Sequence, residues 1–178
     1  MIRGLIFDLD GVIVDTAKYH FLAWKELARE LGVRFTKKDN ERLKGVSRVR
    51  SLEIILEING LTLPDAQKQA YCTRKNNRYL EYIGQLKEEE ILPGAKQFLL
   101  DSRAAGYRIA LGSASKNTKL ILEKLNITDL FDAVIDGTKV TTAKPDPEVF
   151  LKGAEEVGLA PSECVVFEDA EAGVRAAH

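Results

Sequence analysis

Few features of the sequence suit a membrane, a secretory route or a nucleic-acid partner. No apolar run reaches the roughly 18 residues that a membrane-spanning helix needs. Asp8 and Asp10 interrupt the first apolar stretch, whereas a signal peptide has a continuous apolar region. The net charge of −1 provides no basic excess that would attract nucleic acid. These absences predict a cytoplasmic protein without a membrane or nucleic-acid partner.

Cysteine is also scarce. Cys72 and Cys164 lack the spacing of a metal site, so we interpret them as free thiols in a reducing compartment, with one disulfide between them as the alternative. Internal repeats and low-complexity tracts are missing as well. With 45% apolar and 30% charged residues, the 178-residue chain is typical of a globular protein with one core and room for a small second domain.

Four short apolar runs each end in small or acidic polar residues. They cover residues 5–7, 107–112, 133–135 and 164–167, and helical patterns over 95–105, 119–125 and 146–158 lie between them. Near-continuous apolar runs suit parallel strands that are covered on both faces. The alternation predicts an α/β fold with a doubly wound, mainly parallel sheet of Rossmann type. Ligands of such sheets bind at the carboxyl ends of the strands.

The stretch from about residue 16 to residue 92 contains no convincing strand. Apolar stripes and capping residues predict helices that begin near Thr16, Thr36, Ser47 and Pro64. We therefore expect an all-helical cap domain at residues 16–92, inserted into an α/β catalytic core formed by residues 1–15 and 93–178.

Asp8 and Asp10 lie two residues apart at the end of the first predicted strand, so their carboxylates point to the same side. One carboxylate can attack phosphorus and hold the phosphoryl group, while the other moves a proton on the attacking or leaving oxygen. Gly11 lets the backbone approach a ligand closely. The alternative is a hairpin turn at Asp10-Gly11 between two apolar runs.

Glu168 and Asp169 form a second acidic pair, after the last predicted strand. Mg²⁺ prefers such oxygen ligands, and several carboxylates at one sheet edge would repel one another without a cation. Lys144 could neutralise a transferring phosphoryl group, and the Ser113 hydroxyl could bind one of its oxygens. Taken singly, each has an ordinary alternative: a strand-end turn or helix cap for the acidic pair, a turn residue for Ser113 and a surface lysine for Lys144.

The predicted cap contains a basic segment. Ser47-Arg48-Val49-Arg50 puts two arginines in the first turn of a helix, directly after Lys44-Gly45. Positive charge there opposes the helix dipole, but a helix start with nearby cations is a good anion site. The alternative is a solvated basic face. For His20, early in the first cap helix, the alternative is a structural role.

The acidic, serine and lysine positions resemble, in order and spacing, the four motifs of the haloacid dehalogenase superfamily of phosphotransferases. These motifs are Asp8-Leu9-Asp10-Gly11-Val12, Ser113, Lys144-Pro145 and Glu168-Asp169, and the resemblance covers essentially the whole chain. A narrower resemblance connects the chain to the glucose-phosphate mutases of that superfamily. It rests on residues 15–20, 23–24, 43–48, 51–52 and 112–117.

The resemblance implies a role for each matching residue. Asp8 would be the phosphorylated nucleophile and Asp10 the general acid/base. The Mg²⁺ ligands would be the side chains of Asp8, Glu168 and Asp169 and the backbone carbonyl of Asp10. The transferring phosphoryl group would contact Ser113, Ala114 and Lys144, and the distal phosphate Arg48, Lys116 and Asn117. Residues expected at the sugar, in the cap or in its hinge are Thr16, His20, Trp24, Lys44, Gly45 and Ser51.

The implied reaction converts β-glucose 1-phosphate into glucose 6-phosphate through phospho-Asp8 and a glucose bisphosphate. A closing cap would exclude water, which otherwise hydrolyses the acyl phosphate. A phosphatase of the same superfamily would use the same residues and pass the phosphoryl group to water. A third hypothesis is an inactive protein that only binds a sugar phosphate or a partner protein.

Two features depart from the resemblance. Ala170 follows the acidic pair where such mutases often have serine, which removes one hydroxyl. The chain ends at His178, where the superfamily continues with another strand and more helix, so we expect strand 164–167 to be a sheet edge. A chain shortened in this way would be less stable or would associate, whereas a full-length chain would be monomeric.

Overall fold

The computed structural model describes residues 1–43 and 47–178. Within these residues the chain divides into two compact units. Met1–Thr16 and Gln85–His178 form one unit, which contains all of the strands and is called here the α/β unit. Ala17–Gly84 forms the other, the helical unit.

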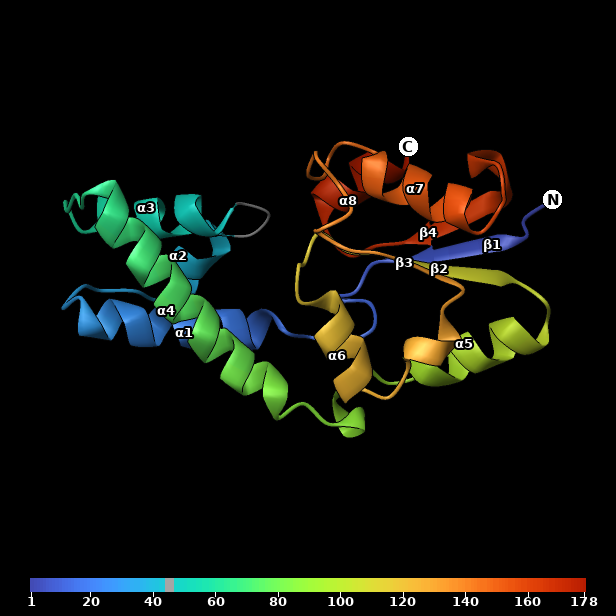
Figure 1. Cartoon of the computed structure of the whole chain (residues 1–178), viewed down its shortest axis with the longest axis horizontal. Helices are drawn as coiled ribbons and strands as arrows, with labels where there is room; N and C mark the ends of the chain where they lie inside the picture. The colour runs from blue at the N-terminus through green and yellow to red at the C-terminus, as the bar shows by residue number, and fades with distance from the viewer. Residues whose placement is uncertain (44–46) are drawn as a thin grey trace. The chain divides into compact units, whose positions relative to one another are not determined.

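The α/β unit is built on a parallel four-stranded sheet in the order β3-β2-β1-β4. The strands are β1 (Gly4–Phe7), β2 (Arg108–Gly112), β3 (Ala133–Ile135) and β4 (Cys164–Phe167). Its α-helices are α5 (Ala95–Ala104), α6 (Thr118–Lys124), α7 (Glu148–Glu156) and α8 (Glu171–Ala177), and its short 3-10 helices are Glu88–Glu90, Thr128–Leu130 and Pro161–Glu163. Figure 1 shows α7 and α8 on one face of the sheet and α5 and α6 on the other. The predicted doubly wound α/β fold is thereby confirmed.

Strand β1 lies inside the sheet, and its side chains form part of the core. Leu5, Ile6 and Phe7 are all buried. Phe7 pairs in register with Leu111 of β2 and with Phe167 of β4, so the carboxyl ends of these three strands reach the same edge. The polar residues that follow the three strands therefore meet there. Strand β4 is the outer strand on its side of the described sheet, as predicted from the sequence.

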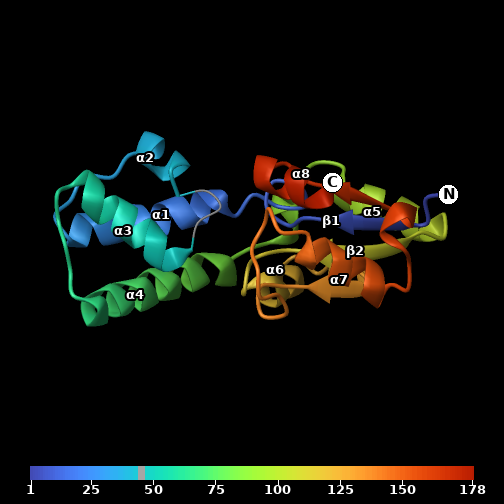
Figure 2. The same cartoon turned by 90° about the horizontal axis from the view of Figure 1, so that it is seen from above.

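The helical unit contains α1 (Ala17–Glu30), α2 (Lys37–Glu41), α3 (Arg48–Ile58) and α4 (Asp65–Gly84). Helix α4 contacts both α1 and α3 (Figure 2). The sequence predicted two of the helix starts through their capping residues. The Thr36 hydroxyl accepts a hydrogen bond from the Asp39 backbone N–H, and the Ser47 hydroxyl accepts one from Arg50.

The second junction between the units lies at Gly84 and Gln85, whereas the sequence suggested residues 92 and 93. Two contacts hold residues 85–92 to the α/β unit. The backbone N–H of Leu92 donates to the carbonyl of Ile13 at 2.8 Å, and Val14 forms an antiparallel bridge with Ile91. This segment therefore belongs with the sheet, although it contains no strand of its own.

Two expectations from the composition can be compared with the structure. Cys72 and Cys164 are both free thiols. None of the helices in the described residues is long and apolar enough to cross a membrane.

Candidate active site

Asp8 directly follows β1 and is held at the sheet edge by its own backbone. Its N–H donates to the carbonyl of Phe167 at 2.9 Å, which continues the pairing of β1 with β4. The residue is only 8% exposed. Its carboxylate accepts a hydrogen bond from Lys144 Nζ at 2.6 Å, and Lys144 Nζ also donates to Glu168 Oε2 at 2.7 Å. A single ammonium group thus bridges the ends of β1 and β4.

The surroundings of Asp8 raise its pKa to about 6. Burial is the main cause, because it disfavours the charged carboxylate. The positive charge of Lys144 opposes the rise, and the negative charges of Glu168 and Asp10 add to it. Asp8 is therefore a buried carboxylate whose ionised form depends on nearby positive charge.

The Asp10 carboxylate contacts Thr16, the last residue of the Met1–Thr16 segment of the α/β unit. Asp10 Oδ1 accepts hydrogen bonds from both the backbone N–H and the hydroxyl of Thr16, the former at 2.8 Å. Burial raises the Asp10 pKa, and the two bonds from Thr16 oppose that rise. Thr16 therefore fixes the orientation of the Asp10 carboxylate from within the same unit.

The hairpin alternative for Asp10-Gly11 is wrong. In the described sheet, β1 pairs with β2 and β4 in parallel, so no antiparallel partner follows the turn. Gly11 instead has φ of +82°, and a Cβ atom there would lie 2.1 Å from Asp169 Oδ2. A side chain at this position would occupy the space of an acidic residue at the site.

Glu168 and Asp169 follow β4 and complete an acidic group. The Glu168 carboxylate accepts hydrogen bonds from the backbone N–H groups of Asp169 and Ala170, at 3.1 and 3.0 Å, besides the bond from Lys144. Burial is the main cause that raises the Asp169 pKa, and the charge of Glu168 adds to it. One carboxylate oxygen each of Asp8, Glu168 and Asp169 lie within 4.8 Å of one another. Convergent carboxylate oxygens are the ligands that suit a hard divalent cation such as Mg²⁺.

Gly173 is a residue of this site that the sequence did not single out. It lies in α8, and a Cβ atom on it would be 1.8 Å from Glu168 Oε2. The helix therefore approaches the carboxylate as closely as a bare backbone allows. The available signal was a glycine inside a helix, within two turns of an acidic pair. Glycine lowers helix stability, so its presence inside a helix usually has a packing reason.

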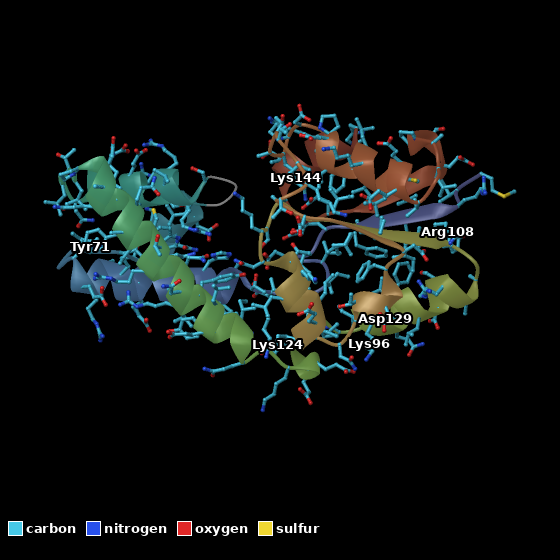
Figure 3. The ribbon with its side chains drawn as sticks, viewed as in Figure 1. Tyr71, Lys96, Arg108, Lys124, Asp129 and Lys144 are labelled. Atoms are coloured by element: carbon cyan, nitrogen blue, oxygen red, sulfur yellow. The ribbon has the colours of Figure 1, made fainter. Side chains whose placement is uncertain are left out.

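Lys144 comes from the loop between β3 and α7 (Figure 3). Its side chain is 13% exposed, and its ammonium group lies 4.7 Å from the centre of the Phe150 ring. The alternative of an ordinary surface lysine is therefore wrong. Its two carboxylate partners and the aromatic ring hold the positive charge beside Asp8.

Ser113 directly follows β2, the strand next to β1, and begins a loop that leads into α6. Its hydroxyl accepts a hydrogen bond from the Ser115 N–H at 3.1 Å, and the Ser115 hydroxyl accepts one from Asn117 at 3.1 Å. Gly137 packs against the loop, because a Cβ atom there would lie 2.3 Å from the Ala114 carbonyl oxygen. Ser113, Ala114, Lys116 and Asn117 therefore share one ordered turn at the carboxyl end of β2.

The helical unit has a separate polar cluster around a residue that the sequence did not single out. Lys75 in α4 is only 2% exposed, and its Nζ lies 2.6 Å from Nδ1 of His20. The ammonium group also lies 4.9 Å from the centre of the Trp24 ring. Lys75 follows Cys72 and precedes Tyr79 on the buried side of α4, so helical periodicity was the available signal.

Positive charge dominates this second cluster. Burial is the main cause that lowers the pKa of Lys75 to about 7, and the charge of Arg48 contributes to this lowering. Burial likewise lowers the pKa of His20 to about 3, with Lys75 and Arg48 contributing. At neutral pH His20 is therefore an uncharged ring that stacks on Tyr79, with ring centres 3.9 Å apart.

The basic segment of the helical unit divides into two parts. Arg48 begins α3 and acts electrostatically on His20 and Lys75, whereas Arg50 pairs on the surface with Glu57 at 2.6 Å. Ser51 in the same helix is buried. Lys44 and Gly45, which the sequence also suggested, lie outside the described residues.

Comparisons with family models, with known sequences and with solved structures agree with one another. A family model described as haloacid dehalogenase-like hydrolase matches residues 2–178. A β-phosphoglucomutase of Bacillus subtilis is 44% identical over 98% of this chain and 78% of that protein. A fructose-1-phosphate phosphatase of Escherichia coli is 32% identical over 98% of this chain and 90% of that protein. The crystal structure of a β-phosphoglucomutase from Clostridium difficile has a TM-score of 0.89 and 42% identity, covering 99% of this chain and 80% of the other.

Proposed function

Because the chain belongs to the haloacid dehalogenase-like hydrolase family, we propose that it is a Mg²⁺-dependent β-phosphoglucomutase. The reaction converts β-D-glucose 1-phosphate into glucose 6-phosphate through a glucose 1,6-bisphosphate. The observation that carries the proposal is the buried Asp8 carboxylate, held by Lys144 beside Glu168 and Asp169. The 44% identity to the Bacillus subtilis β-phosphoglucomutase supports glucose phosphate as the substrate.

Asp8 is the nucleophile in this proposal. Its carboxylate oxygen bonds to phosphorus, and the bond from phosphorus to the donor oxygen breaks, which leaves an acyl phosphate on Asp8. Lys144 lies 2.6 Å from Asp8 Oδ1 and can offset the negative charge that develops on the transferring group. The Ser113 hydroxyl and the N–H of Ala114, after the neighbouring strand, would bind the phosphoryl oxygens.

Asp10 moves the proton. When the 6-hydroxyl of the sugar attacks phospho-Asp8, its proton passes to the Asp10 carboxylate. In the return step the same proton is given to the departing oxygen. The raised Asp10 pKa suits a group that must both accept and release a proton, and Thr16 holds its carboxylate in orientation.

Asp8, Glu168, Asp169 and the backbone carbonyl of Asp10 would hold Mg²⁺. Bound Mg²⁺ supplies positive charge for the phosphoryl oxygens and for the three neighbouring carboxylates. The donor set fits this ion because its members are carboxylate and carbonyl oxygens, three of which converge within 4.8 Å.

The two units would act as a catalytic core and a cap in this proposal. The α/β unit would carry the chemistry, and the helical unit would close over the sugar and exclude water. Arg48, Lys116 and Asn117 would bind the phosphate that is not being transferred. Residues proposed to contact the sugar are Thr16, His20, Trp24, Lys44, Gly45, Ser51 and Lys75.

A phosphatase is the second candidate function, favoured by the 32% identity to the fructose-1-phosphate phosphatase. The same Asp8 and Asp10 would serve, with water in place of the sugar hydroxyl. The 44% identity to the Bacillus subtilis β-phosphoglucomutase supports the mutase over the phosphatase.

The test is a product assay with β-glucose 1-phosphate, Mg²⁺ and a priming amount of glucose 1,6-bisphosphate. We expect glucose 6-phosphate as the main product and only traces of free phosphate. If free phosphate is the main product, the mutase function is rejected and the phosphatase function is supported. If neither product forms and no phosphoryl donor labels Asp8, both functions are rejected.

A further inference from the structure

Lys144 has a well-defined position although it lies in a long connection without regular structure. The connection runs from the end of β3 at Ile135 to the start of α7 at Glu148. Such loops are usually the more mobile parts of a protein. Yet the Lys144 ammonium group must stay within hydrogen-bond distance of two carboxylates from two different strands. Something outside the sheet edge must therefore fix the loop.

The side chain of Glu148 provides that support. Glu148 Oε2 accepts hydrogen bonds from the backbone N–H groups of Thr141 and Thr142, at 2.9 and 2.7 Å, and from the Thr141 hydroxyl at 3.0 Å. Its other oxygen pairs with Lys152, one helical turn later, at 2.7 Å. The side chain is 19% exposed, and these bonds lower its pKa to about 2, so it is ionised throughout the physiological range.

These bonds close the chain into a ring around Lys144. The ring begins at Thr141 and Thr142, passes through Lys144 and returns along the backbone to Glu148. Lys144 is two residues from one anchor and four from the other, and each residue spans at most about 3.6 Å. The Asp146 carboxylate tightens the far side by accepting from the Glu148 N–H at 2.9 Å.

We propose that Glu148 is a positioning residue for Lys144. Its carboxylate ties the loop to the first turn of α7 and so holds the Lys144 ammonium group on Asp8 during phosphoryl transfer. The inference rests on the proposed function, because it assigns Glu148 a part in that chemistry. Glu148 touches no reacting atom, and its effect passes through the backbone of residues 141–144.

The first test is kinetic. Glu148→Ala removes all three loop bonds, so we expect kcat to fall by roughly ten- to hundredfold, the size of loss that a misplacement of about 1 Å can cause. We expect KM to change by less than about twofold, because ground-state binding does not depend on this bond. Glu148→Gln retains one carbonyl oxygen as acceptor and should restore most of the activity.

Two further variants separate positioning from plain stabilisation. Glu156→Ala removes an exposed ion pair between the same helix and Lys139 of the same loop; Lys139 lies five residues before Lys144 and outside the ring, so we expect unchanged kcat. In a Lys144→Met background, Glu148→Ala should cause no additional loss, because the group that it positions is already gone. An equal loss in both backgrounds, or a lower melting temperature with unchanged kcat, would overturn the inference.

The second test does not require turnover. Reductive methylation, read by mass spectrometry, measures how accessible the Lys144 amine is in the folded protein. We expect slow labelling in the wild type and in Glu156→Ala, and several-fold faster labelling in Glu148→Ala. Equal labelling rates in all three would overturn the inference. Faster labelling in a protein that makes no glucose 6-phosphate would reject the proposed function and leave the role of Glu148 in place.

Discussion

Each unit holds a lysine that is mostly shielded from solvent, but the two lysines have opposite surroundings. Lys144 in the α/β unit contacts the carboxylates of Asp8 and Glu168. Lys75 in the helical unit contacts the His20 ring and lies over aromatic rings, and no carboxylate in the described parts of the chain forms an ion pair with it. The positive charge of Arg48 acts on Lys75 instead. One cluster therefore has excess negative charge, and the other has excess positive charge.

The difference indicates what each cluster requires. Carboxylates that converge at a sheet edge are stabilised by a cation, which Lys144 supplies in part and Mg²⁺ would complete. A buried ammonium without a carboxylate has lost its hydration, and its pKa of about 7 reflects that loss. An anionic ligand would restore a partner for Lys75.

The largest effect is expected from removing the nucleophile on the acidic side. Asp8→Asn keeps the shape of the side chain but cannot form the acyl phosphate, so turnover should fall by roughly ten-thousandfold. The measurement is glucose 6-phosphate formation together with radiolabelling by a phosphoryl donor. Persistent labelling of the variant would show that another residue carries the phosphoryl group.

A smaller effect is expected from crowding the same cluster. The Cβ atom of Gly173→Ala would lie 1.8 Å from Glu168 Oε2, so the carboxylate must move. Displacing a metal ligand through its surroundings typically weakens metal affinity by about ten- to hundredfold, which a Mg²⁺ titration of activity would detect. Gly84→Ala is the matched control, because nothing lies within 4 Å of a Cβ atom there. An unchanged Mg²⁺ requirement would argue against Glu168 as a ligand.

A substitution in the basic cluster should change substrate binding, measured as KM, rather than the chemical step. Lys75→Met removes the buried charge while filling its space, and we expect KM to rise by roughly tenfold or more, as for loss of a charged hydrogen bond. Lys68→Met serves as control, because Lys68 in the same helix pairs with Glu53 and Asp65 at the surface. Equal KM values for wild type and Lys75→Met would separate the cluster from the substrate.

The last expected effect is on stability at alkaline pH and involves no catalysis. The pKa of Lys75 is about 7 in the folded protein and 10.5 without burial, so between these values the unfolded chain binds more protons. The free energy of unfolding should therefore rise with pH across this window, by at most about 1.4 kcal/mol per pH unit from this group. Denaturant titrations at pH 7 and pH 9 should show the rise in the wild type and a weaker one in Lys75→Met. Parallel curves for the two proteins would contradict a buried, deprotonating lysine.

The sequence predicted the acidic site better than the basic one, for a physical reason. An apolar run that stops at polar residues indicates the end of a buried strand. Because parallel strands end at the same edge of a sheet, the sequence predicted that Asp8, Ser113 and Glu168 would lie at one edge. The caps at Thr36 and Ser47 are equally local signals, and the structure confirms them. Such features depend on neighbours within a few residues.

The missed features depend on distant partners. Helical periodicity can place Lys75 on the buried side of α4, but its partners come from the packing of α1 and α3 against α4, which the α4 sequence alone does not specify. The unit boundary near residue 85 follows from the bonds of Leu92 and Ile91 to residues 13 and 14, almost eighty positions earlier. The role of Glu148 also appears only when the loop is folded back on its helix.

The pairing of β1 has a consequence for the order of events during synthesis. Its neighbours are β2, which begins at Arg108, and β4, which begins at Cys164, so the first of these partners leaves the ribosome about 100 residues after β1. At 5–20 residues per second this delay is about 5–20 s. The helical unit, Ala17–Gly84, is continuous in sequence and is complete within that interval. The apolar segment Leu5–Phe7 must therefore remain without its strand partners while the whole helical unit is synthesised and has time to fold.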